Sequence, residues 1–398
     1  MRRAEAGIQV DKFYPPTDWL DNNNKQIDIR KNAENNSVVL LVGHSADFSK
    51  YSLLGLLADT SAGTYDVYID DVLVGSGITK NTQYDIDFST INTTYGSATT
   101  PEALVLHKVV VKPTTSGSTI TKFSHKRNTN SNTENTISLL WGHFELNNDI
   151  NIEGFLYSWQ YYKIINTFAI TAKNDILNCR SINIPFYFAT VNNDFNYLPE
   201  ITMPSNQHLM YELIDNTTKL KRVRLKDIIC NTEAAGTFAR NVGLEQIAIN
   251  DVKIENLTTT RQVFRDNRKL KSILDIKYNN SVNCADLITN AMELYPTKLD
   301  ISKGKNITIL GTYGTSTYPM RGLRGLKVSN EAPFTGTSPQ INVSYTGLDR
   351  EALVELFNSL PTVTGSQILK CDNCTGTADL TDEDKAIATN KGWGLTLS

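Results

Sequence analysis

Residues capable of metal or nucleophilic chemistry are few in this chain. Cys371 and Cys374 form a C-x-x-C pair, which is the spacing of two zinc ligands. A zinc ion needs four ligands, and no second pair or histidine stands nearby in the sequence. We therefore favour two small, half-buried residues in a loop between C-terminal helices over a zinc site. The cysteine count of five is odd and low, which argues against a disulfide scaffold and for synthesis in a reducing compartment.

Histidines and aspartates fall mainly in segments rich in β-forming residues. The histidines match no ligand set, and we expect partly buried strand residues at His44, His107, His125, His143 and His208. The aspartates allow two interpretations, because calcium prefers several hard oxygen ligands, whereas charges on an edge strand discourage pairing with other chains. We favour the edge strand, with a hairpin turn at the adjacent pair. These aspartates are Asp66, Asp70, Asp71, Asp85 and Asp87.

The sequence contains none of the common catalytic motifs, such as G-x-x-x-x-G-K-[ST], G-x-G-x-x-G, G-x-S-x-G or H-E-x-x-H. A carboxylate pair for glycoside hydrolysis needs spatial rather than sequential proximity, and nothing points to one. A net charge of −3 gives no general attraction to nucleic acid or anionic lipid. No apolar run is long enough for a membrane span, and no secretion signal is recognisable at the start. We predict a non-enzyme without cofactor or metal.

A row of polar residues is the best candidate for a binding site. In segments of the form L-x-x-L-x-L, the residues between the apolar positions point away from the core along one face. This row is polar, slightly basic and free of aromatic residues, which suits a protein or glycan ligand and not nucleic acid. A merely solvated sheet remains an equal alternative. The candidate binding face comprises Arg222, Arg224, Gln246, Ser272 and Lys327.

The segments that carry this row repeat between about residues 195 and 346. LPEITM, LKRVRL, LEQIAI and LRGLKV share one apolar frame, beginning at Leu198, Leu220, Leu244 and Leu323. LKSILDI at Leu270 fits less cleanly, and KLDIS fills the gap before Leu323. A period of roughly 20 to 29 residues is typical of leucine-rich repeats, in which each strand is too small to bury its apolar face alone. We therefore predict an irregular leucine-rich-repeat solenoid over residues 195–346.

Residues 37–150 predict a different β-domain. Seven short runs rich in β-branched and aromatic residues are separated by Gly, Asn, Asp, Ser and Thr, which indicates a β-sandwich of immunoglobulin-like size. Within TYDVYID, the alternation places Tyr65, Val67 and Ile69 on one face. Residues 151–194 form an aromatic-rich transition into the repeats. The chain of 398 residues thus holds two or three domains, and its class is α+β, mainly β.

Two helices are predicted in residues 347–398, which would form a capping unit for the repeats. Leu353, Leu356, Phe357 and Leu360 have helical spacing, and Pro361 ends that helix. A second helix follows Thr381, which forms a capping box with Asp384, and Gly392 lies at its end. GWGLTLS then forms a last strand. Such an atypical end closes the open edge of a repeat stack.

Residues 1–36 are predicted to be an attachment segment. FYPPTDWL places Phe13, Tyr14 and Trp19 beside two prolines, which makes a stiff apolar segment able to dock on a partner. The alternative is that this segment packs on its own domain.

Two parts of the sequence resemble a known family. The run LDREALVELFNSLPTVTGSQILKCDNCTGTADLTDEDKAIATNKGWGLTLS is similar to the end of BspA-like leucine-rich-repeat proteins. TYDVYIDDVLVG, YDIDFST, TTPEALVLHKVVVKPTTSGSTITKF and LLWGHFEL resemble the β-domain before the repeats in those proteins. Such proteins are frequent in tailed phages of gut anaerobes, including crAss-like phages.

The resemblance implies a virion protein, a tail fibre or other tail-associated protein that attaches to a host. Other tail proteins and a host cell-surface glycan or protein would be its partners, and fibre proteins are commonly homo-oligomers. In bacterial relatives it implies a surface adhesin that binds host proteins or glycans at the cell surface. The repeats here are irregular, and no export or sorting segment is recognisable, which favours the phage interpretation.

Overall fold

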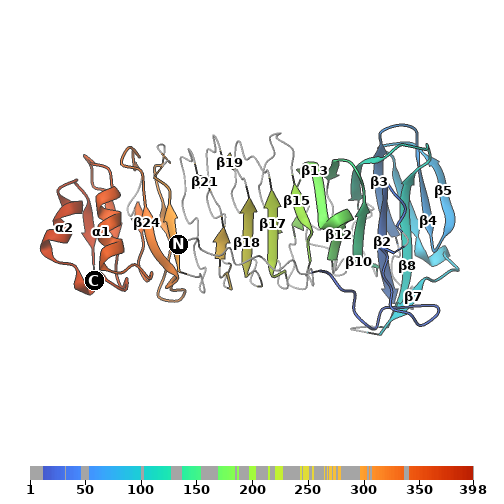
Figure 1. Ribbon diagram of the computed structural model, residues 1–398, viewed down its shortest axis with the longest axis horizontal. Coiled ribbons are helices and arrows are strands. Elements are labelled where there is room, and N and C mark those ends of the chain that lie inside the picture. The colour runs from blue at the N-terminus through green and yellow to red at the C-terminus, as the bar shows by residue number, and fades with distance from the viewer. Residues whose placement is uncertain are drawn as a thin grey trace.

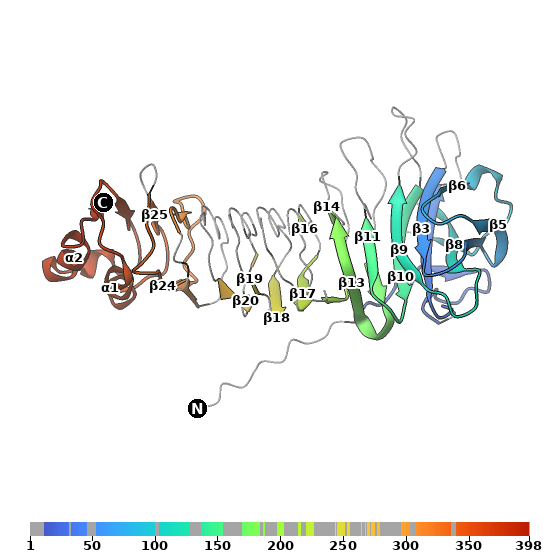
Figure 2. The ribbon, with the colours of Figure 1, turned by 90° about the horizontal axis from the view of Figure 1, so that it is seen from above.

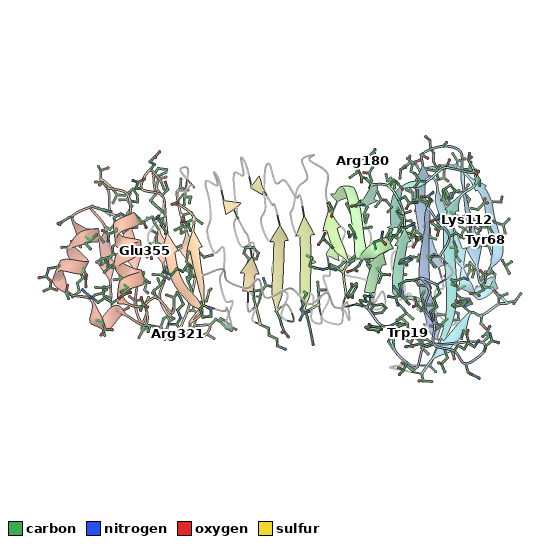
Figure 3. All side chains as sticks on the ribbon, in the orientation of Figure 1. Trp19, Tyr68, Lys112, Arg180, Arg321 and Glu355 are labelled. Atoms are coloured by element: carbon green, nitrogen blue, oxygen red, sulfur yellow. The ribbon has the colours of Figure 1, made fainter. Side chains whose placement is uncertain are left out.

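The computed structural model is an elongated, mainly β molecule (Figures 1 and 2). Two sheets of N-terminal strands form one end, parallel strands continue along the rod, and two α-helices lie at the other end. Trp19 belongs to the first end, and Arg321 and Glu355 to the second (Figure 3). The structure describes residues 12–31, 33–45, 53–99, 103–126, 137–153, 169–183, 186–187, 197–202, 214–215, 220–226, 243, 245–250, 253–254, 264, 267, 269–270, 272–274, 277–278, 296–302, 304, 307–335 and 340–397.

One N-terminal sheet has eight strands and is mostly antiparallel. Its main path follows the order β1-β7-β8-β2-β10-β12, and β4 joins β8 and β5. Asp70 and Asp71 form the predicted turn between β4 and β5, with φ of 50° and 69°, as two-residue hairpins require. The strands are β1 (Leu20–Asp21), β2 (Ser37–Ser45), β4 (Tyr65–Ile69), β5 (Val72–Ile78), β7 (Gly96–Ala98), β8 (Leu104–Pro113), β10 (Ile137–Glu145) and β12 (Ala169–Ala172).

The second sheet has nine strands and joins the N-terminal strands to the repeats. Its order is β20-β18-β17-β15-β13-β11-β9-β3-β6, antiparallel from β6 to β9 and parallel from β9 onward. This one sheet therefore contains strands from both sides of the domain boundaries predicted at residues 150 and 194. The strands are β3 (Leu53–Thr60), β6 (Gln83–Asp87), β9 (Ile120–Lys126), β11 (Ile150–Glu153), β13 (Ile176–Asn183), β15 (Glu200–Thr202), β17 (Arg222–Lys226), β18 (Gln246–Asn250) and β20 (Ser272–Leu274).

The two sheets share an apolar core. Alternate residues of β2 and β10 face β9, and the rings of Phe123 and Phe144 meet edge to face at 5.9 Å. Tyr65, Val67 and Ile69 are all fully buried, which confirms the alternation predicted for TYDVYID. All seven strands predicted between Val38 and Leu146 are present. Strands β3 and β7 were not predicted, because the run LLGLLADT of β3 lacks alternation and β7 has only three residues.

Residues 12–31 cover the outer face of the eight-stranded sheet. Phe13, Trp19 and Ile27 pack there against the residues of β2 that point away from the main core. Strand β2 is consequently buried on both faces, which explains its continuous apolar run VVLLV. Strand β1 lies so close to β7 that a Cβ atom at Gly96 would collide with the carbonyl oxygen of Leu20. Glycine is therefore required at this crossing.

The repeat frame is confirmed wherever the structure describes it. Leu198, Leu220, Leu270 and Leu323 are buried, and Leu244 lies outside the described residues. Neighbouring turns stack in register, since Ile201 lies beside Leu225 and Leu225 beside Ile249. The result is a β-solenoid-like arrangement. The shorter strands are β14 (Phe186–Tyr187), β16 (Ile214–Asp215), β19 (Lys253–Ile254), β21 (Lys277–Tyr278), β22 (Thr297–Asp300), β23 (Gly311–Thr312), β24 (Leu323–Lys327), β25 (Ile341–Asn342), β26 (Ile368–Lys370) and β27 (Gly394–Thr396).

The C-terminal unit has both predicted helices, α1 (Arg350–Ser359) and α2 (Asp382–Thr389), and the last strand β27. The four apolar residues predicted for the core face are buried, namely Leu353, Leu356, Phe357 and Leu360. Thr381 and Asp384 form the predicted capping box, and Gly392 has a φ of 88°. Lys391 donates from Nζ to three carbonyl oxygens at the end of α1, which satisfies acceptors that a helix leaves unpaired. In the part of the chain that the structure describes, three short 3₁₀ segments also occur: η1 (Phe88–Thr90), η2 (Lys173–Asp175) and η3 (Thr377–Asp379).

Within the described part of the chain, neither helix is long or apolar enough to cross a membrane.

Candidate binding surface

Four of the five residues of the candidate binding face lie in adjacent strands of the parallel part of the nine-stranded sheet. Arg222 of β17 is beside Gln246 of β18, which is beside Ser272 of β20. Arg224 occupies the next outward position along β17, beside Ala248. The parallel register therefore turns residues about one repeat apart in sequence into a row of neighbours. Strands β17 and β18 lie side by side in Figure 1.

The two arginines point away from the core. Val223 lies between them and is buried, so strand alternation places Arg222 and Arg224 on the opposite face. Both arginine side chains are partly accessible, and the preceding Lys221 is exposed. Toward the N-terminal strands, the same face continues with Glu200 and Asn178. The surface is thus polar and carries charges of both signs.

Arg224 is held in place by groups from the corner before β13. Its guanidinium donates to the carboxylate of Asp175, and the Tyr197 hydroxyl donates to the other oxygen of the same carboxylate. Asn174 and Asp175 both have positive φ, 55° and 61°, so the chain turns sharply there from β12 to β13. Burial, followed by the hydrogen bond to Asp175, raises the pKa of Tyr197. Tyr197 therefore stays protonated and acts as a hydrogen-bond donor.

Sequence reasoning missed this corner and the apolar residue next to it. Ile176 is 40% exposed at the start of β13, on the outward face beside Glu200. Asp175 lies just before β13 and Tyr197 just before β15, and these two strands are neighbours in the sheet. The repeat spacing was the sequence signal that could have predicted that these two residues meet. The exposed residue Arg180, labelled in Figure 3, lies further along β13.

Lys327 is not part of the row. It is exposed on β24, which pairs with β22 in a separate two-stranded sheet. Its neighbour in the register of that sheet is Asp300. The structure therefore brings together Arg222, Arg224, Gln246 and Ser272, and leaves Lys327 nearer the helical end.

The predicted docking segment is divided between the core and the surface. Phe13 and Trp19 are buried, and Phe13 meets the ring of Trp141 edge to face at 4.9 Å. Arg30 stacks on the same tryptophan and donates to the carbonyl oxygen of Phe13. Tyr14 points outward and is 75% exposed. Phe13 and Trp19 therefore pack on their own domain, as the alternative interpretation had it. Docking on a partner stays a prediction for Tyr14.

Cys371 and Cys374 are buried rather than half-buried and lie directly after β26. Cys374 donates from Sγ to the carbonyl oxygen of Val343 and accepts from the Thr346 hydroxyl. Burial raises the pKa of both thiols, so neither is a ready nucleophile or metal ligand. Cys179 is a third buried thiol, in β13.

The aspartates have structural partners. Asp85 and Asp87 lie in β6, the last strand of the nine-stranded sheet, which confirms the edge-strand interpretation. Asp66 accepts from the backbone N–H of Gly77, and Asp87 accepts from that of Ser89. Asp71 is paired with Lys108.

The histidines of β2, β8 and β10 are more deeply buried than predicted: His44, His107 and His143 each have a relative exposure of 3% or less. The side chain of His125 and all of His208 lie outside the described residues. Among the residues that the structure describes, no three His, Cys, Asp or Glu side chains are arranged to hold a metal ion.

Comparison of the chain with protein-family models, with curated proteins and with solved structures finds no match.

Proposed function

We propose that this chain is a structural protein of a phage particle, a tail fibre or other tail appendage, whose repeat stack presents a recognition surface for host attachment. It works by binding and catalyses no reaction. Its partners are other tail proteins at one surface and a host cell-surface glycan or protein at another. It assembles as a homo-oligomer in the virion.

The observation that carries this proposal is the register of the candidate binding face. Arg222, Gln246 and Ser272 occupy neighbouring register positions in adjacent parallel strands, and the side chain of Arg222 lies on the face opposite the buried Val223. Extended repeat faces of this kind suit long or repetitive ligands, because each repeat adds one similar position at a fixed spacing. The resemblance of the C-terminal run to BspA-like proteins of tailed phages supports the same proposal.

The finer fold forms part of the proposal. The N-terminal strands would be a β-sandwich of immunoglobulin-like size, supported by two sheets that share one core. The repeats would be an irregular leucine-rich-repeat solenoid, supported by one short strand per repeat and by buried leucines in the predicted frame. Helices α1 and α2 would close the stack.

Binding of the purified full chain to intact cells of the source culture tests the attachment function. We expect saturable binding that falls about tenfold in Arg222→Ser, because arginine side chains at interface centres commonly contribute on that scale. Lys385→Ala is the matched control, since Lys385 pairs only with its helix neighbour Asp382 among the ion pairs described, far along the rod on α2. Binding that is equal in wild type and Arg222→Ser would remove the candidate face from the proposal.

A further inference from the structure

Four large hydrophobic side chains are exposed in the part of the chain that the structure describes: Tyr14, Val72, Leu73 and Ile176. Val72 and Leu73 are neighbours in β5, among the N-terminal strands. Tyr14 and Ile176 are far apart in the sequence, but one set of contacts links them. Exposed apolar residues that lie around one polar cluster indicate a binding surface, whereas single ones need no explanation.

The link between these two residues runs through Tyr197. Its ring lies 5.9 Å from the ring of Phe13, which precedes the exposed tyrosine, and its hydroxyl donates to Asp175, which precedes the exposed isoleucine. Asp175 in turn accepts from Arg224 of β17. Because Asp175 lies in the turn from β12 to β13, we call this group the corner surface. It comprises Tyr14, Asp175, Ile176, Tyr197 and Arg224.

The backbone on both sides of Tyr14 is held in place. Arg30 donates to the carbonyl oxygen of Phe13 at 3.0 Å, and the side-chain amide of Gln26 donates to that of Pro15 at 2.6 Å. The two prolines that follow the tyrosine also restrict the chain. An aromatic ring on a fixed backbone loses little conformational freedom when a ligand stacks on it. The exposed ring of Tyr14 is therefore prepared for the apolar face of a ligand.

The polar part of the corner surface combines donors with acceptors. Asp175 and Arg224 form an ion pair, and both side chains are partly accessible. In the contacts that the structure describes, each oxygen of Asp175 accepts one hydrogen bond and Arg224 uses one of its five N–H groups, so both can bond further. Glu200, beside Ile176 in the register of the sheet, adds another carboxylate. This corner therefore carries no excess of positive charge that would attract an acidic ligand.

We propose that the corner surface binds an uncharged oligosaccharide. This inference rests on the proposed attachment function and names the ligand class and its place. The apolar face of a sugar ring stacks on Tyr14, and sugar hydroxyls donate to Asp175 and accept from Arg224. A protein partner fits less well, because a stable protein interface buries about 800 Å² on each side and involves about 20–30 residues. The corner surface offers two exposed apolar side chains around one ion pair.

Biolayer interferometry with surface polysaccharide from cells of the source culture tests the inference. The polysaccharide is treated with protease and separated by anion exchange, and the uncharged and acidic fractions are immobilised as separate probes. We expect the full chain to bind the uncharged fraction, and Tyr14→Ala to bind it about tenfold more weakly. Leu73→Ala also removes an exposed apolar side chain, but from β5, and is the matched control that should bind as the wild type does.

Asp175→Asn tests the charge argument. Asparagine tolerates the positive φ of 61° at this position, and the substitution leaves the charge of Arg224 without its carboxylate partner. We therefore expect Asp175→Asn to bind the acidic fraction more tightly than the wild type does. An unchanged preference between the two fractions would contradict the assignment to an uncharged ligand.

Three results with the wild-type chain and Tyr14→Ala would overturn the inference: binding to the acidic fraction alone, binding to neither fraction, or equal binding by the two proteins. Cell binding that is lost after the cells are treated with protease would also overturn it, since the receptor would then be a protein and the attachment function would stand. A chain that binds the uncharged fraction but is absent from phage particles would contradict the proposed virion function instead.

Discussion

His143 is buried in β10, and its neighbours determine which of its nitrogens carries the hydrogen. Burial, opposed by Glu145, lowers the pKa of His143, so the ring is neutral. The carboxylate of Glu145 can only accept, so His143 Nε2 donates to it, and Glu145 also pairs with Lys173 of η2. His143 Nδ1 then accepts from the Thr171 hydroxyl at 2.9 Å, and the same Oγ1 accepts from the Trp141 N–H at 2.8 Å. This network fixes the corner from which the first repeat starts.

Thr171→Val should destabilise the fold strongly, although the substitution changes the shape of the side chain very little. It leaves the Trp141 N–H without its acceptor and His143 Nδ1 without its donor in a buried site. The expected loss is about 1–3 kcal/mol in the free energy of unfolding, measured by urea denaturation. Thr202→Val on the outward face of β15 is the matched control and should change stability by less than about 0.5 kcal/mol. Equal effects of the two substitutions would mean that the network does not stabilise the fold.

At the scale of the elements, the sequence predicted what depends on local pattern. The capping box of α2 and the alternation of β4 depend only on residues close together in the sequence, and both were confirmed. The apolar repeat frame was also predictable, because burial of Leu220 and Leu270 needs only the period. The pairing of one strand with another could not be predicted from the sequence. Nothing near Arg224 shows that Asp175 would meet it, since that contact depends on the turn between β12 and β13.

Leu270→Ala tests the repeat element directly. Leu270 is fully buried and follows the equally buried Phe264 and Asn267, so the substitution leaves a cavity between stacked turns. We expect a loss of about 2–5 kcal/mol in the free energy of unfolding. Lys269→Ala, one residue earlier and exposed, should stay within about 0.5 kcal/mol of wild type. If Leu270→Ala were as stable as Lys269→Ala, the buried repeat frame would be wrong.

At the scale of the whole molecule, the N-terminal strands and the repeats are joined through shared sheets. Strand β11 adds in parallel to β9, and β12 adds in parallel to β10, so both sheets extend toward the repeats. The N-terminal strands therefore cover the first open edge of the stack, as the helical unit does at the other end. Figure 2 shows the N-terminal strands at one end and α1 and α2 at the other, with β17 and β18, the strands of Arg222 and Gln246, between them.

Peptide mass spectrometry across a density gradient of lysate from the source culture tests the proposed function most directly. The proposal predicts that peptides of this chain peak with phage particles, at a fixed copy number relative to the capsid protein. That ratio would also bound the symmetry of the assembly. Peptides that instead follow the cell envelopes and are absent from the particle fractions would contradict the virion assignment and support a bacterial surface adhesin.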